Sequence, residues 1–418
     1  MKRVVITGLG TINSVGHNVE DSFKAVVDGV CGIDTITLFD IAEFPVKIAG
    51  EVKDFDPSTV MDKKEVKKAD RFIQLGIKAA HEAMMDCGLA GEDGKVDPSI
   101  ADRFGIISAS GIGGLSTIEK NSVVCTNRGP KRISPFFIPS SLVNMLSGFI
   151  SIAHRLRGPS LSHVTACAAS THALNDAVKT IATNGADRIL VVGAESAICG
   201  AGMGGFASMK ALSSRNDDPK TASRPFDTDR DGFVMGEGAG ALVVETLESA
   251  LERNAKIYCE IIGFGESGDA NHITAPVMDG PLRAMNAALA MAKANTGEDI
   301  KIDYINSHGT STPVGDANES KAIETAFNGV ENCPPVTSTK GQIGHCLGAA
   351  GAIEAIFAIK ALNEGIIPPT INIENQDPEC KLDYVPGTAR KVNLTTVMSN
   401  NFGFGGTNGS VIFKKFES

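Results

Sequence analysis

A cysteine among very small residues is the first feature of this sequence that could do chemistry. Cys167 lies in VTACAAS, after the strand-like LSHV and before a segment whose apolar residues have helical spacing from Leu174 to Ile181. Free backbone N–H groups and the helix dipole favour a thiolate at such a helix start, and the small neighbours leave room for a substrate. Cys167 is therefore a candidate nucleophile. The alternative interpretation is a buried structural cysteine, because the chain has nine cysteines.

Two further stretches carry histidines. His308, in NSHGTSTPVGD, follows a strand-like segment, which suits a base or a hydrogen-bond donor, although a histidine there can also simply cap the next helix. In TSTKGQIGHCLGAAG, Lys340 and His345 precede an Ala-rich helical segment that carries one acid, Glu354. An unpaired buried carboxylate is costly, so Lys340 is the expected partner of Glu354.

The fourth stretch is the glycine-rich SNNFGFGGTNG at 399–409. Its glycines predict a loop whose backbone approaches a ligand closely, or places an N–H group as an oxyanion donor. Phe402 and Phe404 are bulky side chains on that flexible track, and we expect them to gate a pocket.

Composition excludes several classes of function. The chain has 418 residues and a net charge of −10, so bulk attraction to nucleic acid or to anionic lipid is not expected. No Cys-x-x-Cys pair occurs, which argues against a zinc site or a disulfide framework. No run of about 18 apolar residues and no signal peptide are present, so we expect no membrane span and a cytoplasmic location.

The pattern of apolar residues predicts an α/β fold. Short β-branched runs alternate with Ala-rich helical segments, which is typical of sheets buried on both faces. The predicted strands are 3–8, 103–110, 188–194, 240–246, 260–265, 303–309, 334–339 and 409–415. The predicted helices, expected to lie between layers, are 71–88, 170–185, 281–297 and 348–365. The polar segments 126–135 and 213–232 are expected to be surface excursions.

A faint internal repeat divides the chain. GFVMGEGAGALVVE at 232–245 is similar to NFGFGGTNGSVIF at 401–413, and RVVITGLG near residue 3 is similar to EIIGFGES near residue 260. The repeat predicts two structural halves, 1–257 and 258–418.

In this order, the motifs TACAAS, HGTSTPVGD, KGQIGHCLGAAG and SNNFGFGGTN resemble the condensing enzymes of the thiolase superfamily, most closely the β-ketoacyl-acyl carrier protein synthases that elongate fatty acids. The resemblance covers essentially the whole chain, and one Cys with two His is the elongating pattern. It implies a five-layer αβαβα fold of two related halves, the first carrying Cys167 and the second carrying both histidines. It also implies a homodimer with the strand at about 161–165 in the interface.

The resemblance implies a reaction as well. Cys167 takes an acyl chain, and malonyl-acyl carrier protein then loses CO2 and attacks it, in a decarboxylative Claisen condensation with no required cofactor. Backbone N–H groups of Cys167 and Phe404 form the oxyanion hole, His308 and His345 stabilise the enolate, and Lys340 orients His345 and pairs with the supporting Glu354. Both substrates are carried on the phosphopantetheine of acyl carrier protein.

Peripheral roles follow from the same resemblance. Ile112 and Phe206 line the acyl pocket, as in the type II synthases, and Thr310 and Thr312 bind the phosphopantetheine arm. The residues expected to dock the acidic carrier protein are Lys67, Lys68, Lys131, Arg132 and Lys210. In some relatives a monovalent cation is held in the region of Asn306, Glu354, Ser399 and Asn400.

Three other functions stay open at this point. A polyketide-type ketosynthase is the closest rival within the family. A non-catalytic partner subunit of a polyketide complex is disfavoured by the presence of Cys167. A degradative, coenzyme A-dependent thiolase differs in not decarboxylating malonyl-acyl carrier protein.

Overall fold

The computed structural model describes residues 2–417. Its largest sheet has ten strands. The strands of its first portion are β1 (Val4–Ile12), β4 (Phe104–Ala109), β5 (Ser160–His163), β6 (Arg188–Glu195) and β7 (Gly238–Thr246). Those of its second portion are β8 (Cys259–Gly268), β9 (Tyr304–Asn306), β10 (Val336–Thr337), β13 (Thr396–Gly403) and β14 (Thr407–Lys414). Each predicted strand segment overlaps one of these strands, and β5 and β13 are additional.

The two portions repeat one topology. The order is β5-β4-β6-β7-β1 in the first and β10-β9-β13-β14-β8 in the second, so the first strand of each portion lies beside its last. The portions join where β1 meets β8, through only two residue pairs, Val5 with Glu260 and Ile6 with Cys259. The similar sequence pairs lie on equivalent strands, β1 with β8 and β7 with β14. The fold is therefore built from two related halves, as predicted.

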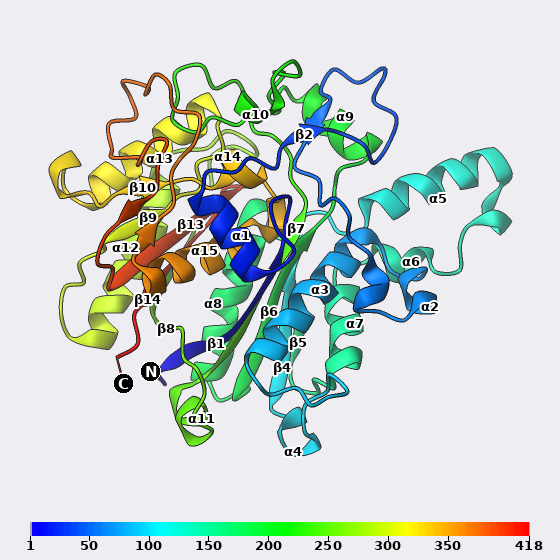
Figure 1. Cartoon of the computed structure of the whole chain (residues 1–418), viewed down its shortest axis with the longest axis horizontal. Coiled ribbons are helices and arrows are strands. Elements are labelled where there is room, and N and C mark those ends of the chain that lie inside the picture. Colours follow the sequence, from blue (N-terminus) through cyan, green and yellow to red (C-terminus); the bar gives the residue numbers. More distant parts are fainter. Residues whose placement is uncertain (1, 418) are drawn as a thin grey trace.

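Helices complete five layers (Figure 1). The pair α3 (Arg71–Asp86) and α7 (Met145–His154) covers the outer face of the first portion, and α12 (Asp279–Thr296) with α13 (Pro313–Ala326) covers the second. The central layer is α8 (Ala169–Ala182) and α15 (Ala350–Glu364), which contact strands of both portions and each other.

The central position predicted for all four Ala-rich helices is correct for α8 and α15 and wrong for α3 and α12. The outer helix α12 shows the reason. A Cβ at Gly265 of β8 would lie 2.0 Å from the carbonyl oxygen of Ala284 on that helix. The small residues of α12 therefore serve close approach to a single sheet face, and they do not require burial on both sides.

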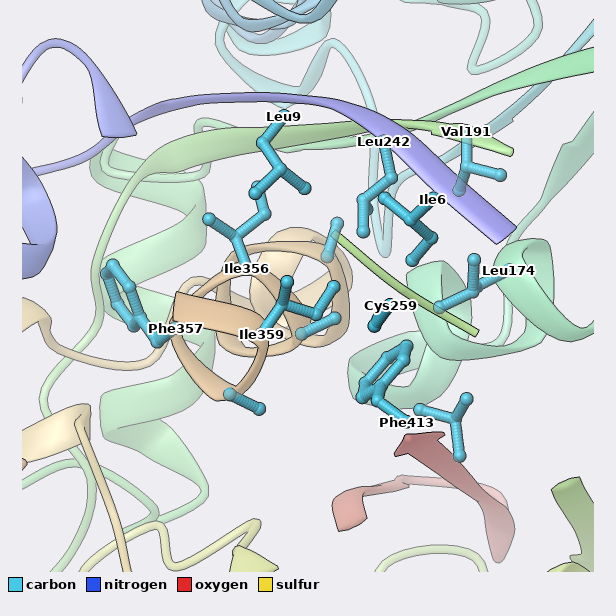
Figure 2. Packing of buried hydrophobic residues seen from close by; sticks show 14 of the residues in the cluster. Ile6, Leu9, Leu174, Val191, Leu242, Cys259, Ile356, Phe357, Ile359 and Phe413 are labelled. Carbon is cyan, nitrogen blue, oxygen red and sulfur yellow. The ribbon is translucent and has the colours of Figure 1, made fainter. Parts of the chain in front are cut away.

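The core lies around the central helices (Figure 2). Thirteen of the fifteen residues of α15 are buried. Ile356 and Ile359 of α15 pack in one cluster with Ile6 of β1, Leu242 of β7 and Phe413 of β14, so that both portions of the sheet are bound to the same helix. Burial of this apolar surface holds the halves together.

Both segments expected to be polar surface excursions contain ordered structure. Residues 126–128 close α5 (Leu115–Arg128), a helix that extends away from the body in Figure 1. In the second segment, Arg224 is buried against Asp227 at 2.9 Å, and buried Arg230 meets Asp377 at 2.7 Å. The surface prediction was wrong here because these charges are paired internally.

The glycine-rich stretch at 399–409 is also more ordered than predicted. It is a hairpin in which β13 and β14 pair from Thr396–Lys414 to Gly403–Thr407, leaving only residues 404–406 as a turn. Gly405 and Gly406 have φ of 85° and 68°, which glycine adopts at little cost. Phe402 thus lies on a strand, and Phe404 lies in the turn.

Shorter elements connect these layers. The remaining α-helices are α1 (Val19–Val27), α2 (Lys63–Val66), α4 (Pro98–Ala101), α6 (Phe137–Ser141), α9 (Gly200–Ser208), α10 (Pro219–Ala222), α11 (Leu247–Glu252) and α14 (Lys340–Ile343). Two-stranded pairs are formed by β2 (Asp34–Thr35) with β3 (Ile48–Ala49) and by β11 (Ile366–Ile367) with β12 (Arg390–Lys391). Between residues 2 and 417, no helix combines the length and apolar character needed to cross a bilayer.

Candidate active site

A cavity of about 510 Å³ brings the sequence-predicted chemistry together. Its wall includes Cys167 from the first half, with His308, His345 and Phe404 from the second. These residues are separated by up to 237 positions in the chain, and the junction of the two halves makes them neighbours.

The thiol stands on a tight turn at the start of a central helix. Cys167 is the middle residue of the 3₁₀ turn η3 (Ala166–Ala168), which runs directly into α8. The second half repeats this arrangement with η5 (Leu347–Ala349) before α15, and Ala166 and Leu347 share a left-handed φ of 49° and 44°. Gly348 is thus the counterpart of Cys167.

Burial governs the state of this thiol. Desolvation raises the pKa of Cys167 to about 12, and the nearby Glu195 carboxylate acts in the same direction. The Lys340 ammonium and the backbone N–H groups of Phe404 and Cys167 lower the pKa of the thiol, but by less. Desolvation thus opposes the thiolate that the helix start favours, and the ionisation of Cys167 stays a prediction.

A glycine lets the hairpin turn reach the thiol. A Cβ at Gly403 would lie 3.0 Å from the carbonyl oxygen of Thr165 and 3.1 Å from the backbone nitrogen of Cys167. This close approach puts the N–H group of Phe404 beside the sulfur, where it lowers the pKa of Cys167. Two backbone N–H groups, of Phe404 and of Cys167 itself, therefore face the same point.

The two imidazoles form a pair. The rings of His308 and His345 lie with centroids 5.3 Å apart at 84°, and Phe402 and Phe233 flank them at 5.7 and 5.3 Å. Burial lowers the pKa of both histidines well below the usual range, and the charge of Lys340 lowers it further. Both rings are therefore neutral at physiological pH.

These rings keep hydrogen-bonding capacity for a ligand. Within residues 2–417, neither ring nitrogen of His345 has a hydrogen-bond partner, and nor does Nδ1 of His308. Buried polar atoms are normally paired, so unpaired nitrogens on a pocket wall are suited to bind a substrate oxygen.

Lys340 and Glu354 form the buried ion pair expected from the sequence. The other oxygen of Glu354 accepts a hydrogen bond of 2.7 Å from Asn401 Nδ2. In the described part of the chain Lys340 donates no hydrogen bond to His345 and reaches it only through its charge. The backbone of His345 is instead held by Val234 O at 2.7 Å and Gly236 N at 2.9 Å.

Comparison with known proteins agrees with this geometry. The family model described as "Beta-ketoacyl synthase, N-terminal domain" matches residues 1–250, and the corresponding C-terminal domain matches residues 258–374. The chain belongs to the β-ketoacyl synthase family.

Curated relatives and solved structures extend the likeness over the full length. The chain is 47% identical to 3-oxoacyl-[acyl-carrier-protein] synthase 2 of Coxiella burnetii and also to that of Vibrio harveyi, over 99% of each chain. It also resembles the structure of the ishigamide ketosynthase/chain length factor, with a TM-score of 0.90 and 35% identity over the whole of both chains. The thiolase-like fold is therefore that of ketosynthases.

One carboxylate of this β-ketoacyl synthase escaped the sequence interpretation. Glu319, on α13, accepts hydrogen bonds of 2.8 Å from the N–H groups of both His308 and Gly309. Burial raises the pKa of Glu319 to about 7. The available signal in the sequence was an acidic residue on the helix that follows the His308 loop. Residue spacing alone does not show that its side chain points back to that loop.

The peripheral residues divide into two groups. Ile112, Phe206, Thr310, Thr312 and Lys210 all line the synthase pocket, and the two threonine hydroxyls are 3.0 Å apart.

The other basic residues do not line the pocket, namely Lys67, Lys68, Lys131 and Arg132. Lys68 pairs with Glu65 at 2.5 Å and lies over the ring of Phe136, while its carbonyl oxygen accepts from Ser140 Oγ at 2.6 Å. These contacts place the two basic segments in one region of the surface.

In the described residues, the region expected to hold a cation contains three buried oxygens without a hydrogen-bond partner, Asn306 Oδ1, Ser399 Oγ and Asn400 Oδ1. Asn306 and Ser399 are register neighbours, but Asn400 lies on the opposite face of β13, where its amide donates to Met285 Sδ of α12 at 3.4 Å. Both oxygens of Glu354 already have partners. The monovalent cation stays a prediction, and the mechanism below uses no cation.

Glu319 predicts the pH dependence of this synthase. As pH falls through about 7, Glu319 gains a proton and accepts the N–H groups of His308 and Gly309 more weakly, so we expect turnover to fall. The histidines stay neutral in this range because their pKa values lie well below it. Glu319→Gln imitates the protonated acid, so it should be slow at every pH and lack this inflection. Turnover measured across the neutral range tests this, with the half-exposed Glu324→Gln on the same helix as control; an inflection that persists in Glu319→Gln contradicts it.

Proposed function

We propose that this chain is an elongating β-ketoacyl-acyl carrier protein synthase, a 3-oxoacyl-acyl carrier protein synthase II. It lengthens an acyl chain by two carbons through decarboxylative Claisen condensation. One observation carries the proposal. A single thiol faces two neutral, unpartnered imidazoles across one pocket, and two backbone N–H groups stand beside the sulfur.

The first half-reaction transfers the acyl group to Cys167. Cys167 Sγ attacks the thioester carbonyl of an acyl-carrier protein, and the N–H groups of Cys167 and Phe404 stabilise the oxyanion. The carrier thiol then leaves with the proton that Cys167 gives up. Because the thiolate is the reactive form, the N–H groups and the Lys340 charge that lower the pKa of Cys167 favour this attack.

The second half-reaction makes and uses a carbanion. The bond between the malonyl carboxylate and C2 breaks, CO2 departs, and the electron pair moves onto the thioester oxygen as an enolate. Neutral His308 and His345 donate hydrogen bonds to that oxygen. C2 then attacks the acyl carbonyl and expels the Cys167 thiolate, which takes a proton from solvent. Bonds and charges balance in this sequence without a metal or a redox cofactor.

The remaining pocket residues fit supporting roles. Ile112 and Phe206 form the wall of the acyl tunnel, and Thr310 and Thr312 offer hydroxyls to the phosphopantetheine arm. Lys340 supports the site through its charge and its pairing with Glu354. Phe404 carries one oxyanion donor and gates the pocket.

A polyketide-type ketosynthase is the second candidate. The ishigamide ketosynthase shares the fold at 35% identity, but the curated relatives named 3-oxoacyl-[acyl-carrier-protein] synthase 2 reach 47%. The presence of Cys167 argues against a purely non-catalytic partner subunit. Release of CO2 from malonyl-carrier protein would separate either synthase from a thiolase.

Separating the half-reactions tests the assignment. Cys167→Ala should lose the acyl adduct that intact-mass spectrometry detects after incubation with acyl-carrier protein, yet still decarboxylate malonyl-carrier protein. His308→Ala should show the reverse, keeping the adduct and losing decarboxylation by about 100-fold or more, the typical cost of an oxyanion donor. A Cys167→Ala protein that still carries the acyl group overturns the nucleophile.

We also propose that the acidic carrier protein docks on a basic region of the surface. Four side chains form this region, and Lys210 at the pocket rim adds a fifth positive charge. Reversing the four charges should raise KM for the carrier-linked substrate and leave a small thioester little changed, because only the carrier carries the complementary charge. The four residues are Lys67, Lys68, Lys131 and Arg132.

A matched control reverses four exposed lysines outside this region, Lys301, Lys381, Lys391 and Lys415. The control changes the net charge by the same amount as the docking variant. An equal rise in KM in both variants would therefore contradict the proposed docking site. Higher salt should also weaken carrier binding in the parent enzyme.

We further propose a homodimer joined at β5. This strand ends the sheet and pairs on one side only, with β4, and it exposes Leu161 at 48%, with the adjoining Val164 at 54%. An open edge bearing apolar side chains is suited to pair with its own copy about a two-fold axis.

Oligomeric state tests the β5 interface. Leu161→Lys should convert a dimer to monomer in light scattering coupled to size-exclusion chromatography, since a charge would be buried at the junction. Leu251→Lys, at an equally exposed leucine of α11, should leave the dimer intact. A Leu161→Lys protein that stays dimeric contradicts the interface.

A further inference from the structure

Glu195, the last residue of β6, is a buried carboxylate that the reaction does not use. Its side chain is fully buried, and in the described residues it makes no ion pair. A carboxylate in this situation is costly unless several donors satisfy it. The hydrogen-bond donors around Glu195 indicate its role.

All five hydrogen bonds of Glu195 come from two pieces of the pocket wall. The loop after β4 supplies Ser110 Oγ at 2.8 Å and the N–H groups of Gly111, Ile112 and Gly113 at 2.5, 3.2 and 3.4 Å. The turn η5 supplies the N–H group of Gly348 at 3.0 Å. One carboxylate therefore ties the first half to the second.

Glycines make room for this clamp. A Cβ at Gly111 would lie 2.8 Å from Glu195 Oε2, and one at Gly348 would lie 2.9 Å from the same oxygen and 2.1 Å from the Gly111 nitrogen. The loop and the turn can meet over the carboxylate only because neither carries a side chain there.

The clamp holds the side chains that face the acyl group. Ile112, whose own N–H group bonds Glu195, lines the pocket beside Cys167 and Phe206. Leu347, next to Gly348, lines the pocket as well and packs in the same cluster. Two adjacent pieces of the pocket wall are thus fixed by the same two oxygens.

We propose that Glu195 is a positioning residue that fixes Ile112 and Leu347 and so sets which acyl-chain lengths this enzyme accepts. This inference rests on the proposed function, since it concerns the acyl tunnel of the same site. It differs from that function in placing length selection in a buried charge outside the pocket lining.

The test is Glu195→Gln, which keeps the size of the side chain but replaces one acceptor oxygen with a donor. Placed at Oε1, that donor can bond only the Ser110 hydroxyl, and it loses the N–H groups of Ile112 and Gly113, so the loop that carries Ile112 should loosen. We expect the ratio of kcat/KM between the best and the worst acyl-carrier protein substrate to fall about tenfold, as expected for loss of a charge-assisted hydrogen bond. Malonyl decarboxylation, which does not use the tunnel, should change less.

A second measurement responds to the charge itself. Glu195 raises the pKa of Cys167, so removing its charge should shift the pH profile of Cys167 alkylation by iodoacetamide to lower pH. A role in folding alone would not move this profile. Ser110→Ala removes one donor and leaves the carboxylate, so it should flatten the length preference without that shift.

Glu245→Gln is the matched control. Glu245 is fully buried at the far end of β7 and is held by Thr7, Ser249 and Arg253, so its loss should lower stability and leave the length profile unchanged. If the parent enzyme condenses but Glu195→Gln keeps the parental length profile, the inference is wrong while the proposed function stands. If the parent enzyme does not condense at all, the proposed function itself fails. Should Glu195→Gln not fold, an unchanged profile in Ser110→Ala overturns the inference.

Discussion

The site depends on the contact between two equivalent turns, η3 before α8 and η5 before α15. Each turn opens the central helix of its own half, and the two helices pack against each other, so the turns meet where the halves join. The loop after β4 packs against both turns: a Cβ at Gly348 of η5 would lie 2.1 Å from the backbone nitrogen of Gly111, and one at Gly111 would lie 3.7 Å from the carbonyl oxygen of Ala166 in η3. Because packed interiors yield little, this contact fixes where Cys167 stands relative to everything on the second half.

That contact also explains an asymmetry between the halves. Gly348 occupies the position equivalent to Cys167, and no larger residue fits there beside Gly111 and Glu195. The second half therefore cannot carry a matching nucleophile. Its chemistry comes from His345, three residues earlier, whose counterpart in the first half is Val164 beside the sheet edge. One fold repeat thus supplies the thiol and the other the hydrogen-bond donors.

Much of this could be predicted from the sequence, and the failures have physical reasons. Strands such as β6 and helices such as α15 are visible in their apolar patterns, and the pairing of Lys340 with Glu354 follows from one acid in an apolar helix. The pKa of Cys167 could not be predicted, because it depends on how many atoms desolvate the sulfur after 418 residues have packed. Glu195 and Glu319 were missed because their partners are backbone N–H groups, which leave no mark on side-chain spacing.

The buried charges act together on the reaction. Lys340 lowers the pKa of both histidines and of Cys167, whereas Glu195 raises the pKa of the thiol. A neutral imidazole can donate a hydrogen bond to an enolate oxygen, and its other ring nitrogen can accept the proton that Cys167 gives up on attacking the thioester. The hydrogen-bond donors therefore stand where negative charge develops during the reaction: at the oxyanion beside Phe404, and at the enolate oxygen between His308 and His345.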